Sequence, residues 1–275
     1  MNYQNKSTPE ENLIIFIHIP KTGGTSLSLI ASRQYKPGVF KMMQAAQEKP
    51  DDLIKILLED RQGEIKAIAT HLGFGLHEII PRSSTHITML REPVDRVISH
   101  YYHACRDKDN MSLKDFMLND LERSYNLQTR YLSGAEFNRN LANKPINYGD
   151  CTNQMLEAAK NNLIEYFNFG ILEKFDESLI LLNRDIRWKV KNLFYYTETN
   201  KSINRRQDNK KFSTHELELI ENYNEFDIEL YRYAEEVFNH KINQLTTLSN
   251  LKLNSFVLIN SFYRGLYKIF KSLTP

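Results

Sequence analysis

The chain has 275 residues, of which 41% are apolar and 25% are charged, and this length and composition predict one large globular α/β domain, with or without a small appendage. Its 36 Lys and Arg residues against 34 Asp and Glu residues give a net charge of only +2, without the basic excess typical of proteins that bind nucleic acids. We therefore expect no nucleic-acid partner. An anionic small ligand stays compatible with this charge, because a few local cations are enough to bind one.

Sequence signals for metal binding, secretion and membrane spanning are lacking. Cys105 and Cys151 lie outside any metal-ligand spacing and are expected to be free thiols, although a disulfide stays open. Residues 1–11 are polar, unlike a secretory signal, and no run of about 20 apolar residues occurs. These features predict a cytoplasmic protein that uses no metal.

Residues 13–34 are typical of the opening of a β-α unit. Leu13–Ile19 is a short apolar run that Pro20 ends, which predicts a buried parallel strand. A tight turn with two glycines follows at residues 21–25, and residues 26–34 are expected to form a helix. His18 falls inside this predicted strand, where the role of a packed core histidine is expected.

The alternation continues along the chain. Further strands are expected over residues 65–70, 85–90, 169–172 and 193–196. Helices are expected over residues 51–60, 93–106, 112–119, 153–167, 175–183 and 227–239, and after a cap at Ser213 or Thr214. Residues 138–149 and 199–211 are expected to form polar loops. The pattern predicts a three-layer α/β/α fold with a central parallel sheet of about five strands.

Polar residues follow directly after three of these predicted strands. They are Lys21, His71 and Arg91. Ligands of parallel α/β sheets bind beyond the carboxyl ends of the strands, so we expect these three side chains to meet on one rim of the sheet.

The turn after the first strand has the composition of a P-loop-like anion site. Gly23 and Gly24 let backbone N–H groups approach a ligand closely, and Lys21 supplies positive charge. The full candidate set is Lys21, Thr22, Gly23, Gly24, Thr25 and Ser26. A Walker A loop has its lysine after the glycines, so the order here does not favour ATP or GTP. A tight turn with an exposed lysine is the competing interpretation.

The segment that begins at Arg91 supplies a second candidate for anion binding. A guanidinium fork suits a terminal phosphate, and Ser99 lies two helical turns into the following helix, where it can add a hydroxyl donor. The alternatives are a salt bridge of Arg91 with Glu92 or Asp95 and an ordinary helix serine. Arg96 stays open between a structural ion pair and a role in the site.

His71 is the candidate general base. Histidine accepts a proton near neutral pH, and this one lies at the expected rim. His77 is the rival candidate, and a structural histidine is the alternative.

Several blocks of the sequence resemble the sulfotransferases that use 3′-phosphoadenosine 5′-phosphosulfate (PAPS). Residues 20–26 are similar to the family's P-K-T-G-G-T-S loop, and residues 91–102 to its R-[DE]-P-x-x-R-x-x-S-x-Y-Y motif. Residues 126–134 and 169–179 resemble two further blocks, so the resemblance extends with gaps from about residue 13 to about residue 206. It is closest to the branch with the heparan sulfate 2-O- and 6-O-sulfotransferases and related bacterial proteins.

The resemblance implies in-line transfer of a sulfuryl group from PAPS to a hydroxyl acceptor, a carbohydrate in this branch, with no metal and with adenosine 3′,5′-bisphosphate (PAP) as product. It implies that Lys21 and its loop bind the 5′-phosphosulfate and that Arg91 and Ser99 bind the 3′-phosphate. His71, in an H-x-x-F segment with Phe74, would be the base. A basic loop with Arg205 and Arg206 matches one that closes over the nucleotide in this family, with a solvated charge run as the alternative.

Two other functions stay open from the sequence: a nucleotide-dependent kinase or other phosphotransferase, and a PAP-binding protein without catalysis. We expect a bacterial-type sulfotransferase domain over residues 1–248 and a basic aromatic helix over residues 249–275. Apolar residues at helical spacing from 259 to 270 suit peripheral contact with the inner face of a membrane, and packing on the chain's own domain or on a second subunit is the alternative. The acceptor's identity and the oligomeric state stay open.

Overall fold

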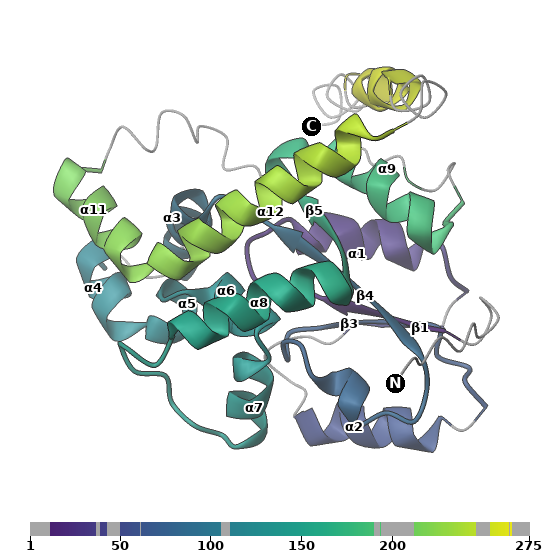
Figure 1. Cartoon of the computed structure of the whole chain (residues 1–275), viewed down its shortest axis with the longest axis horizontal. Coiled ribbons are helices and arrows are strands. Elements are labelled where there is room, and N and C mark those ends of the chain that lie inside the picture. Colours follow the sequence, from purple (N-terminus) through teal and green to yellow (C-terminus); the bar gives the residue numbers. More distant parts are fainter. Residues whose placement is uncertain are drawn as a thin grey trace, which may run out of the picture.

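A parallel sheet forms the centre of the molecule. The computed structural model describes residues 12–36, 39–42, 50–60, 62–105, 111–189, 193, 212–245, 254–263 and 265. The strands are β1 (Leu13–Ile17), β2 (Phe40–Met42), β3 (Ala67–Thr70), β4 (Ser84–Leu90) and β5 (Phe167–Ile171). They lie in the order β2-β3-β1-β4-β5, and each pairing is parallel (Figure 1). The predicted parallel sheet of five strands is confirmed.

Helices cover both faces of this sheet. On one face, α1 (Gly24–Ser32) and α9 (Phe175–Ile186) pack against Phe16 of β1. On the other face, Ile15 and Ile17 pack against α2 (Pro50–Glu59), α6 (Leu127–Leu132), α8 (Asn153–Glu165) and α12 (Glu225–Asn243). Successive strand residues point to opposite faces, so β1 contributes to both apolar cores. The three-layer α/β/α architecture is therefore confirmed.

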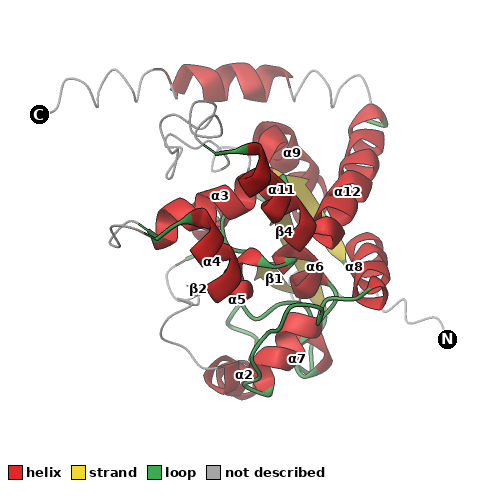
Figure 2. Ribbon diagram, turned by 90° about the vertical axis from the view of Figure 1, so that its left-hand side faces the viewer, coloured by secondary structure: helices red, strands yellow, loops and turns green. Residues whose placement is uncertain are grey.

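A third apolar cluster extends the molecule on one side. It lies among α3 (Pro93–Ala104), α4 (Leu113–Asn119) and α11 (Thr214–Tyr223), and Figure 2 shows α3 and α4 on the opposite side from α8 and α12. The shorter elements are α5 (Leu121–Ser124), α7 (Ala135–Leu141), η1 (Leu76–Glu78) and η2 (Leu172–Lys174). Residues 254–263 are also helical.

The predicted helix starts are confirmed by their caps. Pro93 lies in the first turn of α3, and Ser112 caps α4 by accepting a hydrogen bond from the Asp115 N–H at 3.0 Å. Ser213 forms a capping box with Glu216 at the start of α11. Each cap satisfies backbone N–H groups that the first turn of a helix leaves without a partner.

Two predictions of local structure are wrong. Asn138–Gly149 was expected to be a loop, but α7 runs to Leu141, because Arg139 forms ion pairs with Glu136 at 2.6 Å and Glu122 at 3.0 Å that hold this polar turn in place. The first strand ends at Ile17, so His18 is not inside it.

The outer strand β2 was not predicted, because three residues are too few to show an alternating pattern. The strand expected over residues 193–196 lies outside the described residues except for Leu193, which is in a turn. The basic loop with Arg205 and Arg206 also lies outside the described residues. Among the described residues the sheet thus has five strands, of which β2 lies outside the predicted segments.

Candidate functional site

The candidate residues lie along one rim of the sheet. His71 follows β3 directly, Arg91 follows β4 directly, and Lys21 lies just beyond β1. Since β1 lies between β3 and β4, these three positions are neighbours at the carboxyl ends of the strands. The predicted convergence of the three residues follows from the sheet order.

The turn after β1 has an unusual backbone. Lys21 and Gly23 both have positive φ angles, 71° and 86°. Such an angle is unfavourable for a lysine and is typical of backbone held for a functional purpose. Thr22 between them is fully buried and donates its hydroxyl to the Ile19 carbonyl at 2.8 Å. Its side chain therefore stabilises the turn.

The two glycines are required by close packing. A Cβ on Gly23 would lie 2.5 Å from Cδ1 of Leu172, and a Cβ on Gly24 would lie 1.8 Å from Cδ2 of His18. Within the described chain, no side chain caps the first turn of α1, and that turn contains no acidic residue. The partial positive charge of the helix start is thus available to an anion.

Arg91 is joined directly to this loop. Its side chain is buried, and Nη1 donates a hydrogen bond to the Lys21 carbonyl at 3.0 Å. The backbone of Arg91 is held in turn by Gln128, which accepts from the Arg91 N–H at 3.0 Å and donates to its carbonyl at 2.9 Å. The structure therefore brings the two predicted anion-binding segments into contact.

Gln128 is itself fixed by a distant helix. The carboxylate of Asp227, in the first turn of α12, accepts hydrogen bonds from the N–H groups of Gln128 at 3.0 Å and Thr129 at 2.7 Å. Asn126 has a φ of 40° and accepts from the Asp227 N–H at 3.1 Å. These reciprocal bonds fix the start of α6 against the start of α12.

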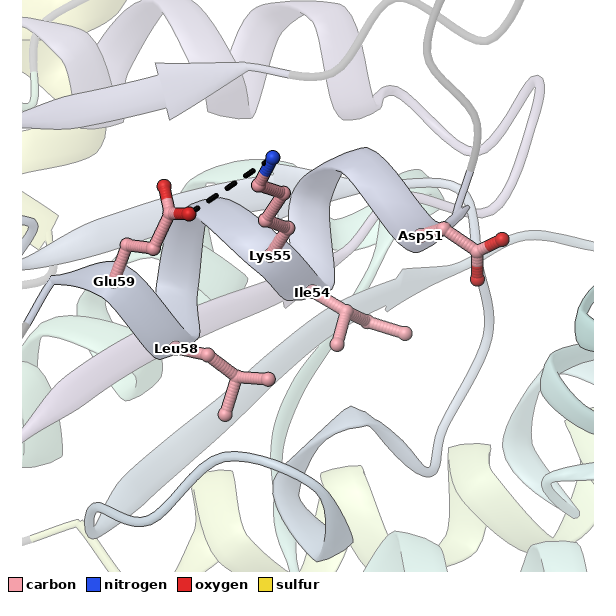
Figure 3. A pocket seen from close by; sticks show the side chains of 5 residues that line it. All are labelled: Asp51, Ile54, Lys55, Leu58 and Glu59. Carbon is pink, nitrogen blue, oxygen red and sulfur yellow. Dashed lines mark ion pairs between the residues drawn. The ribbon is translucent and has the colours of Figure 1, made fainter.

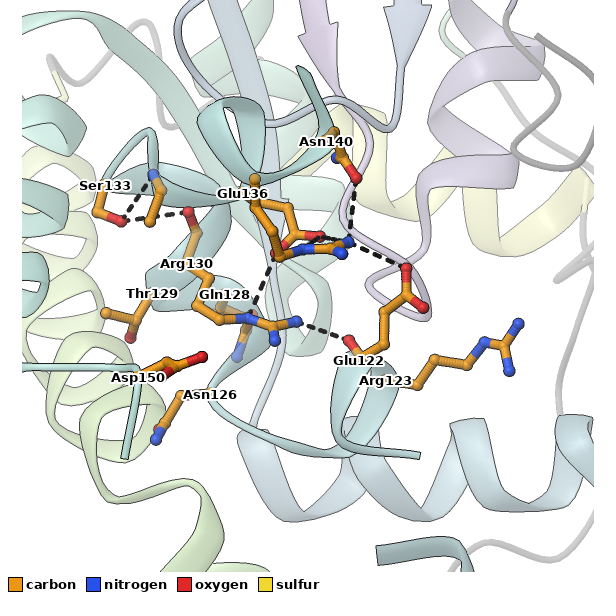
Figure 4. A network of polar contacts seen from close by, with 12 residues as sticks. Glu122, Arg123, Asn126, Gln128, Thr129, Arg130, Ser133, Glu136, Asn140 and Asp150 are labelled. Carbon is orange, nitrogen blue, oxygen red and sulfur yellow. Dashed lines mark hydrogen bonds and ion pairs between the residues drawn. The ribbon is translucent and has the colours of Figure 1, made fainter. Parts of the chain in front are cut away.

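Buried arginines continue this polar network, as Figure 4 shows around Arg130. Arg130 is buried, donates to the Glu122 carbonyl at 2.6 Å and lies 3.4 Å from Glu136. Its charge is thus paired inside the protein. Arg130 lies in the same helix, α6, as Gln128, which holds the Arg91 backbone.

A second support reaches the end of β4 from the segment after β5. Glu173 accepts a hydrogen bond from the Glu92 N–H at 3.1 Å and another from the Tyr231 hydroxyl at 3.0 Å. Glu92 uses its own carboxylate to cap α3, accepting from Val94 at 3.1 Å and Asp95 at 2.7 Å. The blocks around residues 126–134 and 169–179 thus both hold the segment that carries Arg91.

His71 is connected to the loop by His18, whose place in the site was not predicted from the sequence. The rings of His18 and His71 have centroids 4.4 Å apart, and His18 also stacks on Phe16 at 5.4 Å. His18 is half-buried between the loop and His71, not packed in the core as expected. Its place immediately before the loop, where a side chain must lie beside the glycines, is the signal that could have identified it.

Burial keeps both imidazoles neutral. It lowers the pKa of His18 to about 3, with further lowering by the nearby charges of His71 and Lys21. Burial also lowers the pKa of His71, while a backbone interaction with His18 acts in the opposite direction. A neutral imidazole at the rim is able to accept a proton.

His77 lies elsewhere. Its ring packs against Phe74 and His86, with centroid distances of 4.4 Å and 4.9 Å. His86 pairs with Ile15, toward the amino end of β4, which is the end of the strand opposite the rim. Of the two candidate bases, only His71 therefore lies beside the Lys21 loop.

Helix α3 borders the other side of the loop. Arg96 is fully buried and donates to the Arg123 carbonyl at 3.0 Å, and burial lowers its pKa to about 10 although Asp227 raises it. This hydrogen bond gives Arg96 a structural contact with the segment that precedes α6. Ser99 is half-buried on the same helix, next to His100, whose pKa is lowered by burial and by the charges of Arg96 and Lys21.

The surface hollow in Figure 3 is not part of this site. It is lined by five residues of α2, Asp51, Ile54, Lys55, Leu58 and Glu59, none of which follows a strand. Among the residues that the structure describes, no group of three or more His, Cys, Asp or Glu side chains is placed to hold a metal ion.

Comparison with known proteins decides the family. The model of the family described as "Sulfotransferase family" matches residues 7–234. The chain belongs to the sulfotransferase family. The resemblance of its motifs is thereby confirmed.

Two relatives of this sulfotransferase are the heparan-sulfate 6-O-sulfotransferases 3 of Homo sapiens and Mus musculus. Each is 23% identical to it over 87% of this chain and 60% of the relative. The chain thus spans about 60% of the length of these curated relatives. A sulfotransferase from Alicyclobacillus acidocaldarius, solved by crystallography, matches with a TM-score of 0.39 and 17% identity, over 80% of this sulfotransferase and 98% of that chain.

Proposed function

We propose that this sulfotransferase moves the sulfuryl group of PAPS to a hydroxyl group of a carbohydrate, with His71 as the general base. The hydrogen bond between Arg91 and the Lys21 carbonyl carries this proposal. It joins two cationic segments on one rim, and PAPS has an anionic group at each end of its ribose. The names of the relatives, which give heparan sulfate as the acceptor, support a carbohydrate.

The residues of the rim fit this donor. The start of α1, which no side chain of the described residues caps, offers backbone N–H donors for the 5′-phosphosulfate beside Lys21. Arg91 and Ser99 would hold the 3′-phosphate, since a guanidinium fork matches the oxygens of a terminal phosphate. Thr25 and Ser26 add hydroxyl groups to the 5′ site.

When bound, PAPS supplies the sulfuryl group, whose sulfur forms a bond to the acceptor oxygen while its bond to the 5′-phosphate oxygen breaks, leaving PAP. His71 takes the proton of the acceptor hydroxyl, which its lowered pKa allows over the neutral range. The Lys21 ammonium stabilises the negative charge that grows on the departing phosphate oxygen. His18 packs against the His71 ring and limits its orientation. These groups supply the required positive charge without a metal.

Calorimetry with PAP, ADP and AMP tests the donor, followed by transfer of radiolabelled sulfate from PAPS to a panel of polysaccharides. We expect PAP to bind at least about tenfold more tightly than ADP, because a hydrogen-bonded charge pair contributes about 1.5–3 kcal/mol. Arg91→Ala should remove most of that preference, whereas Arg33→Ala on the exposed end of α1 should leave it unchanged.

Three outcomes would contradict the proposal. Equal losses of PAP and ADP affinity in Arg91→Ala would show that Arg91 does not bind the 3′-phosphate. Phosphate transfer from ATP that depends on Mg²⁺ would make the protein a kinase. Tight binding of PAP without labelling of any acceptor would leave a binding protein without catalysis.

A further inference from the structure

One side of the helix formed by residues 254–263 is fixed to the domain. Phe256 is buried in the apolar core shared by α1 and α9. Asn260, one turn later, is fully buried and donates to the Asp176 carboxylate of α9 at 2.6 Å. These contacts determine which side of the helix faces away from the protein.

The outward side is apolar. Leu258 is 71% exposed, Phe262 65% and Ile259 43%, and we call these three residues the apolar face. The other exposed positions of residues 254–263 are Asn254, Ser255, Ser261 and Tyr263, so no exposed position in this range is charged. The exposed positions of α12, by contrast, include Glu225, Glu229, Arg232 and Glu236, as water-facing helices usually do.

The sequence on both sides of the apolar face is basic. Residues 237–275 contain five Lys and Arg residues and no Asp or Glu. Since the whole chain has a net charge of +2, residues 1–236 carry −3, so the end of the chain concentrates the positive charge. An apolar face within a basic segment is complementary to an apolar surface that carries negative charge.

We propose that the apolar face inserts into the interface of an anionic lipid membrane and holds the protein peripherally on it. A second copy of the chain fits the same face less well, because pairing about a two-fold axis would bring two basic segments together. Among the described residues no helix is long and apolar enough to cross a membrane. The three residues of the face are not among the residues proposed to bind PAPS, and their role does not depend on the proposed reaction.

Vesicle sedimentation of the full chain tests this proposal. The vesicles are either phosphatidylcholine alone or phosphatidylcholine with phosphatidylglycerol, each at low and high salt. We expect the protein to sediment with the anionic vesicles at low salt, less at high salt, and hardly with the neutral ones. Replacing Leu258, Ile259 and Phe262 together by Gln should lower the partition coefficient at least about tenfold, since three apolar side chains leave the interface.

The matched control replaces Leu118, Leu141 and Ile164 by Gln, because these are exposed apolar residues on other helices. It should sediment like the unchanged protein. Thermal unfolding should show the same midpoint for all three proteins, because every substituted side chain is exposed. Turnover on a soluble acceptor should also be unchanged, so failure of membrane binding and failure of the proposed reaction are seen separately.

Three results would overturn the proposal. The first is that the unchanged protein does not sediment with anionic vesicles. The second is that the apolar-face variant sediments as well as the control. The third is that sedimentation equilibrium shows a dimer for the unchanged protein and the control but a monomer for the apolar-face variant. That result would assign the face to a second copy of this chain.

Discussion

The Lys21 loop and the end of β4 at Arg91 are neighbours on the same rim, but they are held in different ways. The loop's own turn is formed mainly by residues close in sequence: positive φ angles at Lys21 and Gly23, and the Thr22 hydroxyl on the Ile19 carbonyl three residues before it. Arg91 is held by Gln128, 37 residues later, and Gln128 is held by Asp227, a further 99 residues along the chain. One half of the site is thus local and the other depends on the tertiary fold.

Mutations in the two halves of the site should therefore have different effects. Residues of the local loop lie in one β-α turn, so changing a side chain there should affect the ligand and leave the fold intact. Residues that hold Arg91 are buried and charged or polar, so changing them should affect the fold first. Mutations on each side test this distinction.

The largest effect is expected at Asp227. Its buried carboxylate accepts two backbone hydrogen bonds and lies near the buried Arg96. Asp227→Ala leaves these groups without a partner, and we expect the free energy of unfolding to fall by about 3–5 kcal/mol. Denaturant unfolding measures this, with Glu236→Ala, exposed on the same helix, as the control. Equal stability of the two variants would mean that Asp227 does not hold the site together.

Lys21→Ala tests the local half. We expect turnover to fall about 10²–10³-fold, as on removal of a group that stabilises charge in the transition state, with a much smaller loss of PAP affinity. The free energy of unfolding should hardly change, because Lys21 is only half-buried. Lys55→Ala on the outer surface of α2 is the control. A loss confined to PAP affinity would show that Lys21 binds the donor without acting on the reaction.

His71→Ala should lower turnover about a hundredfold or more, the effect typical of losing a general base, and should leave PAP affinity intact. His77→Ala is the matched comparison, since His77 packs against Phe74 and His86 away from the loop. If His77→Ala lost turnover and His71→Ala kept it, the base would be the other histidine.

The same difference between local and distant contacts determines what the sequence could predict. Strands β1, β3, β4 and β5, the glycine turn and the rim were predictable, because an apolar run, a Pro or Gly and a polar residue at a strand end are patterns within a few residues. The parallel order then brings Lys21, His71 and Arg91 together without further information.

The supporting residues were not predictable in their roles. Gln128 lies in a block that resembles the family, but its hydrogen bonds to the Arg91 backbone link residues far apart in the sequence. Asp227 looks like any acidic residue in the first turn of a helix. Likewise, only packing shows that the His18 ring occupies the space beside Gly24. Non-local contacts of this kind leave no periodic signal in the chain.

Acid should weaken both halves of the site, and the contribution of one histidine between pH 6.5 and 5 is the smallest of the expected effects. Burial lowers the pKa of His18 beside the loop to about 3, and burial with the charges of Arg96 and Lys21 lowers that of His100 on α3 to about 2. Below pH 6.5 the unfolded chain binds protons at these histidines and the folded chain does not, so the free energy of unfolding falls as the pH falls.

The pH window runs from 6.5 down to the folded pKa values, with a slope of up to about 1.4 kcal/mol per pH unit for each histidine. His100→Leu should remove one such contribution, and its stability should therefore decline less steeply between pH 6.5 and 5 than that of the unchanged protein. Denaturant unfolding at several pH values measures the slope, with His215→Gln, exposed at the start of α11, as the control. An unchanged slope in His100→Leu would mean that His100 takes up its proton in the folded protein, and the α3 side of the rim would then be open to water.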